Sequence, residues 1–203
     1  MVEKKTVKLT QISILAALIV VLQVLGYALP AGAFNISLVL IPIVVGGVLF
    51  GVSVGASLGA VFGLVVLIAC VFGFDKGGNI LWNVSPLLTS IVCLGKGAAA
   101  GAAGGAMAAL FRKLKLPVVG VFAAAITVPV VNTGLFITAL WFFFRETLVA
   151  WAGGQDVVYY VFFGLVGVNF LIELGLNLVL APITKRIIMA VRRVSKTSSE
   201  DIV

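Results

Sequence analysis

The feature that most constrains this chain is the length of its apolar runs, which extend for about 15 to 27 residues between interruptions. Of the 203 residues, 62% are hydrophobic and only 10% are charged, so a water-soluble domain could not hide its apolar side chains. Runs of this length suit membrane-spanning helices, whereas the strands of a membrane barrel would be about 10 residues long with alternating polarity. The sequence therefore predicts an all-α integral membrane protein.

Prolines, glycines and polar stretches divide the chain into six predicted transmembrane helices. The helices are expected at about 6–29, 36–50, 53–74, 86–112, 117–144 and 157–188. The connections on the outer face are expected to be loops at 31–35, 75–85 and 145–156. Residues 1–194 are then a single six-helix membrane domain, and the polar residues 195–203 are predicted to be a disordered cytoplasmic tail.

The net charge of +7 is explained by membrane topology rather than by nucleic-acid binding. Lysines and arginines gather before the first apolar run, in the 112–115 connection and after the last run. Cationic residues beside membrane segments mark the cytoplasmic side, where they can also meet anionic lipid headgroups. We therefore expect both the N-terminus and the C-terminus to be cytoplasmic, in a multi-pass protein of a bacterial cytoplasmic membrane.

The sequence offers little equipment for catalysis. Histidine is absent, and Cys70 and Cys93 lie within apolar segments without CxxC spacing, which argues against a metal site or a disulfide framework. Glu173 is the only acidic residue within the predicted spans, so paired carboxylates are lacking as well. No GxxxxGK[ST] phosphate loop occurs. We expect no enzyme activity and no cofactor in this chain, so uphill transport would draw on an ion gradient or on a separate ATPase.

One polar stripe stands out in the last apolar run. Asn169, Glu173 and Asn177 recur every fourth residue, which places them on one helix face over about 12 Å. A carboxylate facing lipid at this depth would be costly. The stripe is therefore predicted to face a polar cavity inside the protein.

Two further helices carry polar residues at membrane depth. Lys96 is expected about 15 Å from the outer end of its helix, too deep to reach water easily, so it needs an anion. That anion is either Glu173, in a structural ion pair, or a substrate carboxylate. Asn132 follows Pro129 by three residues, where the loosened backbone offers polar groups to a ligand, although a hydrogen bond to a neighbouring helix would also explain it.

Glycines at four-residue spacing form two ladders. Gly55, Gly59 and Gly63 lie in the third predicted helix, and a second ladder at Gly97, Gly101 and Gly105 lies in the fourth. Such ladders favour close helix packing, with helix sliding as the alternative. Trp82, in the expected loop 75–85, is interpreted either as an interfacial anchor or as a cover over a ligand.

Four stretches of this chain resemble the substrate-binding S components of energy-coupling factor (ECF) vitamin transporters. They are KLTQISILAALIVVL, ISLVLIPIVVGGVLFGVSVGASLGAVFG, VPVVNTGLFITALWFF and GVNFLIELGLNLVLAP. The resemblance implies six helices around a vitamin site near the outer face, closed by the 1–2 and 3–4 connections. It also implies a membrane-embedded coupling subunit and two ATPase subunits as partners, which would use the ATP.

The resemblance also implies a docking face on the first helix. In that family an alanine-xxx-alanine motif contacts the coupling subunit, and the matching positions here are Ser13 and Ala17, with Ala16 beside them. The serine is a conservative departure that leaves docking plausible and the exact register open.

The polar residues and the resemblance together predict one substrate pocket. Its predicted lining is Asn35, Trp82, Asn83, Lys96, Asn132, Glu173 and Asn177. With Lys96 as the membrane-embedded cation, pantothenate is the preferred vitamin, while folate, riboflavin, a cobalamin-like compound or another micronutrient stay open. Two other classes also stay open: a self-sufficient secondary carrier, and a membrane scaffold in which Lys96 and Glu173 are a structural pair.

Overall fold

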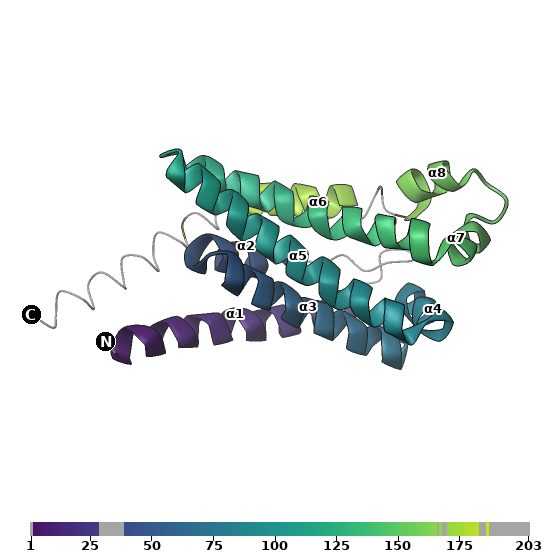
Figure 1. The fold of residues 1–203 in the computed structure, drawn as a ribbon, viewed down its shortest axis with the longest axis horizontal. Coiled ribbons are helices and arrows are strands. Elements are labelled where there is room, and N and C mark those ends of the chain that lie inside the picture. The colour runs from purple at the N-terminus through teal and green to yellow at the C-terminus, as the bar shows by residue number, and fades with distance from the viewer. Residues whose placement is uncertain (1, 29–38, 166, 168–169, 183–185, 187–203) are drawn as a thin grey trace, which may run out of the picture.

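The computed structural model is a bundle of helices (Figure 1), and it describes every residue except 1, 29–38, 166, 168–169, 183–185 and 187–203. No strand occurs among the described residues. The elements are α1 (Val2–Ala28), α2 (Leu40–Phe50), α3 (Val52–Phe72), α4 (Lys76–Val84), α5 (Pro86–Lys113), α6 (Pro117–Phe143), α7 (Arg145–Ala152), α8 (Val157–Tyr159), the π-helix η1 (Tyr160–Leu165) and a helix over Phe170–Pro182. The all-helical fold class is therefore confirmed.

Four of the described helices are long and apolar enough to cross a membrane. They span Lys5–Tyr27, Val52–Phe72, Pro86–Lys113 and Pro117–Phe143. A fifth crossing is present if the pair Arg145–Ala152 and Val157–Leu165, which is bent by 90°, counts as one broken span. These helices indicate a multi-pass membrane protein.

Local sequence signals explain where the long helices begin. Pro86 and Pro117 each occupy the first turn of a helix, where the missing N–H of proline costs nothing, as the sequence predicts. The Ser85 hydroxyl accepts a hydrogen bond from the Leu88 backbone N–H at 3.4 Å and caps α5. Gly51 adopts φ +91° between α2 and α3, a backbone conformation that favours glycine.

The two glycine ladders face each other across α3 and α5. Gly59 lies opposite Gly97, Gly55 lies opposite Gly101, and Gly63 lies opposite Cys93, in antiparallel register. A Cβ atom on any of the three α3 glycines would collide with the facing carbonyl oxygen of α5. The predicted close packing is confirmed, and it makes α3 and α5 the tightest described pair in the bundle's centre.

The helix α4 (Lys76–Val84) occupies most of the stretch 75–85, which corrects the loop expected there. Asp75 caps α4 by accepting a hydrogen bond from the Gly78 N–H at 2.8 Å, and the Asn79 side chain donates to the Cys70 carbonyl at 2.7 Å. Gly77 and Gly78 lie within this helix and are buried. The N-cap and these contacts outweigh the low helix propensity of the glycine pair.

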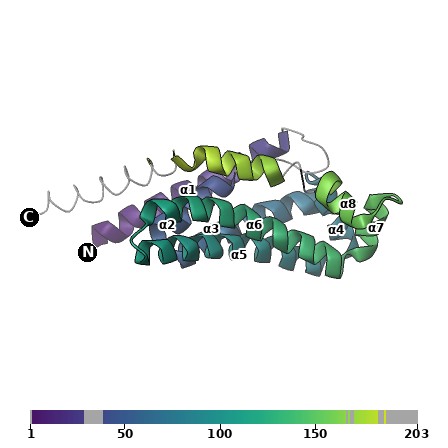
Figure 2. The same ribbon diagram turned by 90° about the horizontal axis from the view of Figure 1, so that it is seen from above.

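The region after α6 also differs from the predicted loop and single long helix. Residues 145–152 form α7, which ends at Gly153 with φ +57°. The segment expected as one helix over 157–188 is divided among α8, η1 and the helix Phe170–Pro182. Figure 2 shows that last helix, in yellow, on the opposite side of the bundle from α5.

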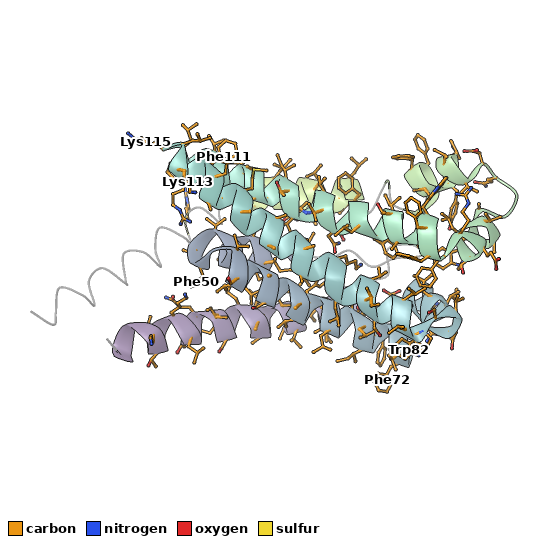
Figure 3. The ribbon with its side chains drawn as sticks, viewed as in Figure 1. Phe50, Phe72, Trp82, Phe111, Lys113 and Lys115 are labelled. Atoms are coloured by element: carbon orange, nitrogen blue, oxygen red, sulfur yellow. The ribbon has the colours of Figure 1, made fainter. Side chains whose placement is uncertain are left out.

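Basic side chains gather at one end of the bundle's long axis, and both signs of charge occur at the other end. The N-terminal end of α1 and the α5–α6 connection lie at one end, and α4 and α7 lie at the other (Figure 1). Lys113 and Lys115 mark the first end, while Trp82 marks the second (Figure 3). The described acidic residues Asp75 and Glu146 belong to the elements of the second end.

Candidate functional site

A cavity of about 110 Å³ lies toward the α4 end of the bundle. Its wall is formed by α1, α3, α4, α5, α6, η1 and the helix Phe170–Pro182. The lining residues are Gln23, Tyr27, Phe62, Val66, Cys70, Asp75, Gly78, Leu81, Thr89, Val92, Cys93, Lys96, Asn132, Thr133, Phe136, Ala139, Leu140, Phe144, Leu165, Phe170 and Glu173. The volume exceeds what one water needs by several times, and it is below the roughly 300–1,000 Å³ of pockets for drug-sized ligands. The cavity therefore suits a small solute.

Three of the predicted site residues meet in this cavity from three separate elements. Lys96 comes from α5, Asn132 from α6 and Glu173 from the helix Phe170–Pro182. Asn132 is 6% exposed and Glu173 is 8% exposed, while Lys96 is half-buried. The Lys96 Nζ atom lies 4.7 Å from the centroid of the Phe136 ring, a distance at which the ring face attracts the ammonium group. The cavity thus holds both signs of charge within an apolar bundle.

The other predicted pocket residues lie elsewhere. Asn177 is buried, but its amide donates to the Glu173 backbone carbonyl at 2.8 Å instead of lining the cavity. Asn83 is exposed on α4 and donates to the Asn79 carbonyl at 2.9 Å. Trp82 is half-buried and packs against the main hydrophobic core. Asn35 lies outside the described residues.

The residues predicted for partner docking lie on α1. Ser13 and Ala17 are exposed, whereas Ala16 is half-buried and packs against the main core. Only 17% of the apolar window of α1 is buried, against 33% to 44% for the other three long helices. Of the four, α1 therefore presents the largest share of its surface to its surroundings.

Four buried polar atoms in the cavity wall lack hydrogen-bond partners among the described residues. The Gln23 Oε1, Tyr27 Oη, Thr89 Oγ1 and Asn132 Oδ1 atoms are inaccessible, and none has a hydrogen-bond partner among the described residues. All four residues line the one cavity. Buried polar groups in folded proteins are nearly always paired, so such a cluster marks a place where a polar molecule completes the bonding.

Sequence reasoning missed three of these four residues. Gln23 and Tyr27 are four residues apart, so they share a face of α1, and that spacing could have found them. Thr89, Cys93 and Lys96 follow the i, i+4, i+7 pattern of one face of α5. The first pair stands within a long apolar run, where two polar side chains on one face indicate a polar neighbour.

The cavity extends from the α4 end of the bundle, its shallow end, to the level of Lys96, its deep end. Thr89 precedes Lys96 by seven residues along α5, which corresponds to about 10 Å of helix axis. Lys96 and Asn132 are at the deep end, while Thr89 lies near the start of α5, where Ser85 joins it to α4. The site is therefore elongated along the bundle.

α4 covers the shallow end. Asp75, Gly78 and Leu81 of this region line the cavity, and a Cβ atom added at Gly78 would collide with the Cys70 sulfur. This close approach holds α4 against α3. The short helix thus separates the polar interior from the end of the bundle.

No protein-family model, curated protein or solved structure matches this chain. Among the described residues, no group of three or more cysteine, aspartate or glutamate side chains is placed to hold a metal ion.

Proposed function

We propose that this chain is the membrane-embedded, substrate-binding S component of an ECF-type importer for a vitamin or related micronutrient. The observation that carries the proposal is the convergence of Lys96, Asn132 and Glu173 on one cavity inside an apolar helical bundle. Ionic groups at membrane depth are costly and are retained where they serve a site or a pathway. Because the cavity is small and lined by several helices, it fits binding of a solute better than continuous conduction through a channel.

The proposed topology has six crossings with both termini in the cytoplasm. The crossings would be α1, α2, α3, α5, α6 and the segment 157–182, with α4 and α7 at the outer face. The 11 residues of α2 are few for a crossing, but eight of them are buried by neighbouring helices, which shield it from lipid. The basic residues at the α5–α6 end support this orientation, because they mark the cytoplasmic side. The cavity would then lie toward the outer face, beneath α4, on the side where a nutrient is collected.

Pantothenate is the proposed substrate. Its single carboxylate suits the single lysine of the cavity, Lys96, and the volume of about 110 Å³ favours a small vitamin over folate, riboflavin or a cobalamin-like compound. The cavity also presents aromatic surface at Phe62, Phe136 and Phe170 for the apolar part of a ligand.

The energy for transport is proposed to come from partners. A membrane-embedded coupling subunit with two ATPase subunits would use ATP, and the exposed face of α1 that carries Ser13 and Ala17 is the proposed docking surface. Small side chains there permit a second helix to approach closely. The competing class is a secondary carrier, which would move the solute without these subunits.

Uptake by vesicles tests this proposal. Vesicles that contain only the purified chain should bind radiolabelled pantothenate without accumulating it, and accumulation should require the coupling subunit, the ATPase subunits and ATP. Accumulation by the chain alone under an ion gradient would identify a secondary carrier instead. Failure to bind any of pantothenate, riboflavin, folate or cobalamin would favour the scaffold alternative.

A further inference from the structure

We infer that Gln23, Tyr27 and Thr89 recognise the uncharged part of the ligand, and that this ligand is an elongated monocarboxylate that carries hydroxyl or amide groups. The inference rests on the proposed function, because it assumes that the cavity binds a solute. It goes further by assigning three residues, two of them on α1, to substrate selection.

Three side chains of the cavity wall carry unsatisfied hydrogen-bonding groups. The Gln23 Oε1, Tyr27 Oη and Thr89 Oγ1 atoms are buried without a hydrogen-bond partner in the described part of the chain. Gln23 is 4% exposed and Thr89 is 2% exposed, so bulk water does not satisfy them. Leaving such groups unpaired opposes folding, and the loss is recovered when a bound molecule supplies partners.

The chemistry of these three side chains determines which ligand groups can pair with them. Tyrosine and threonine hydroxyls both donate and accept hydrogen bonds, while the amide oxygen of Gln23 only accepts. A ligand hydroxyl or amide can donate to the amide oxygen and can meet either hydroxyl. A purely hydrocarbon chain would offer no hydrogen bond to any of the three atoms.

The charged side chains of the cavity wall limit the number of carboxylates that a ligand can carry. Lys96 contributes one positive charge, while Asp75 and Glu173 place two carboxylates in the same lining. A ligand with one carboxylate can meet Lys96, whereas a second carboxylate would be repelled by these acidic side chains. The cavity therefore favours a monoanion over a dicarboxylate.

The distance between Lys96 and the uncharged polar groups of the cavity sets the length of the ligand. Lys96 and Thr89 are separated by about 10 Å along α5. One ligand reaches both only when its hydroxyl or amide groups lie several bonds from its carboxylate. The selected class is thus an extended hydroxy or amido acid rather than a compact one.

Two probes and three variants test this assignment on the purified full-length protein in detergent. Pantothenate has the inferred pattern of groups, and octanoate has the carboxylate without hydroxyl or amide groups. The variants Thr89→Val and Tyr27→Phe each remove one unpaired hydroxyl. Thr127→Val is the matched control, because the Thr127 hydroxyl already donates to the Ala123 carbonyl at 2.7 Å and lies outside the cavity lining.

The expected result is a loss of affinity without a loss of stability. Pantothenate should raise the Tm of the unmodified protein and octanoate should not. Thr89→Val and Tyr27→Phe should each weaken pantothenate binding by about three- to tenfold while leaving the ligand-free Tm unchanged or higher. Thr127→Val should leave the affinity unchanged.

Three results would overturn the inference. One is equal stabilisation by octanoate and pantothenate. Another is unchanged pantothenate affinity in both Thr89→Val and Tyr27→Phe, which would leave the proposed importer function standing. The third is binding of riboflavin, folate or cobalamin with no response to pantothenate, which would again reject the ligand class but retain the importer.

Discussion

The contact between α3 and α5 makes a sharp prediction about Gly97. A methyl group added at Gly97 would collide with the Gly59 carbonyl oxygen, and the reciprocal addition at Gly59 would lie 2.6 Å from the Gly97 carbonyl carbon. Since ordinary contacts to a Cβ atom begin near 3.4 Å, relieving the contact between the new methyl group and the Gly59 carbonyl oxygen requires the two backbones to separate by about 1 Å. Neither side can relieve the clash by changing a rotamer, because both groups belong to helix backbones.

The magnitude follows from that separation. A gap of 0.5–1 Å forfeits roughly a quarter to a half of the dispersion energy between facing atoms. Overpacking of a tight core costs about 1–3 kcal/mol, and a backbone contact belongs at the upper end, so we expect about 3 kcal/mol for Gly97→Ala. The same change should weaken pantothenate binding, since Cys93 and Lys96 of α5 line the cavity.

The matched control is Gly95→Ala, two residues away on the same helix. No atom lies within 4 Å of a Cβ added at Gly95, and the position is exposed. Alanine has the higher helix propensity, so the control should be neutral or stabilising by up to about 1 kcal/mol. Both variants would be measured by urea or thermal unfolding in the same detergent. Equal stability of Gly97→Ala and Gly95→Ala would refute the reasoning from close backbone contact.

Further predictions concern a charge, a helix cap and a strained residue. Lys96→Met should abolish pantothenate binding and leave the fold intact. If Lys96→Met instead lowers the Tm, and the double variant Lys96→Met with Glu173→Gln restores it, the two residues form a structural pair. Asp75→Ala should destabilise α4 by about 1 kcal/mol, seen as faster amide hydrogen exchange in Lys76–Val84, and unchanged exchange there would contradict the capping role. Lys115→Gly should raise stability by about 1 kcal/mol, because Lys115 adopts φ +60°, and a lower Tm would count against strain at this turn.

Helix starts and glycine packing could be predicted because their causes are local. The proline at position 86 and the one at position 117 begin helices wherever the rest of the bundle lies. The glycine ladders identify a close contact by their spacing alone. The position of Lys96 within a long apolar run likewise predicts an enclosed polar site.

The parts that sequence reasoning missed depend on tertiary contacts. Gly77 and Gly78 indicate a loop by propensity, but the Asp75 cap and the packing of Gly78 against Cys70 stabilise α4. The π-helix η1 (Tyr160–Leu165) has no proline to announce it in the sequence. Sequence spacing places Gln23 and Tyr27 on one face of α1, but the helix that this face meets, α3, is set by tertiary packing.

Identification of co-purifying small molecules tests the central claim most directly. The account predicts that the protein isolated from native membranes carries one small hydroxy or amido monocarboxylate at near one molecule per chain. Ala139→Phe, which places a ring into the cavity lining, should abolish the bound molecule in a protein that still elutes as a folded species. A well-folded unmodified protein that carries no small molecule, and whose Tm does not respond to any of the four vitamins, would contradict the account.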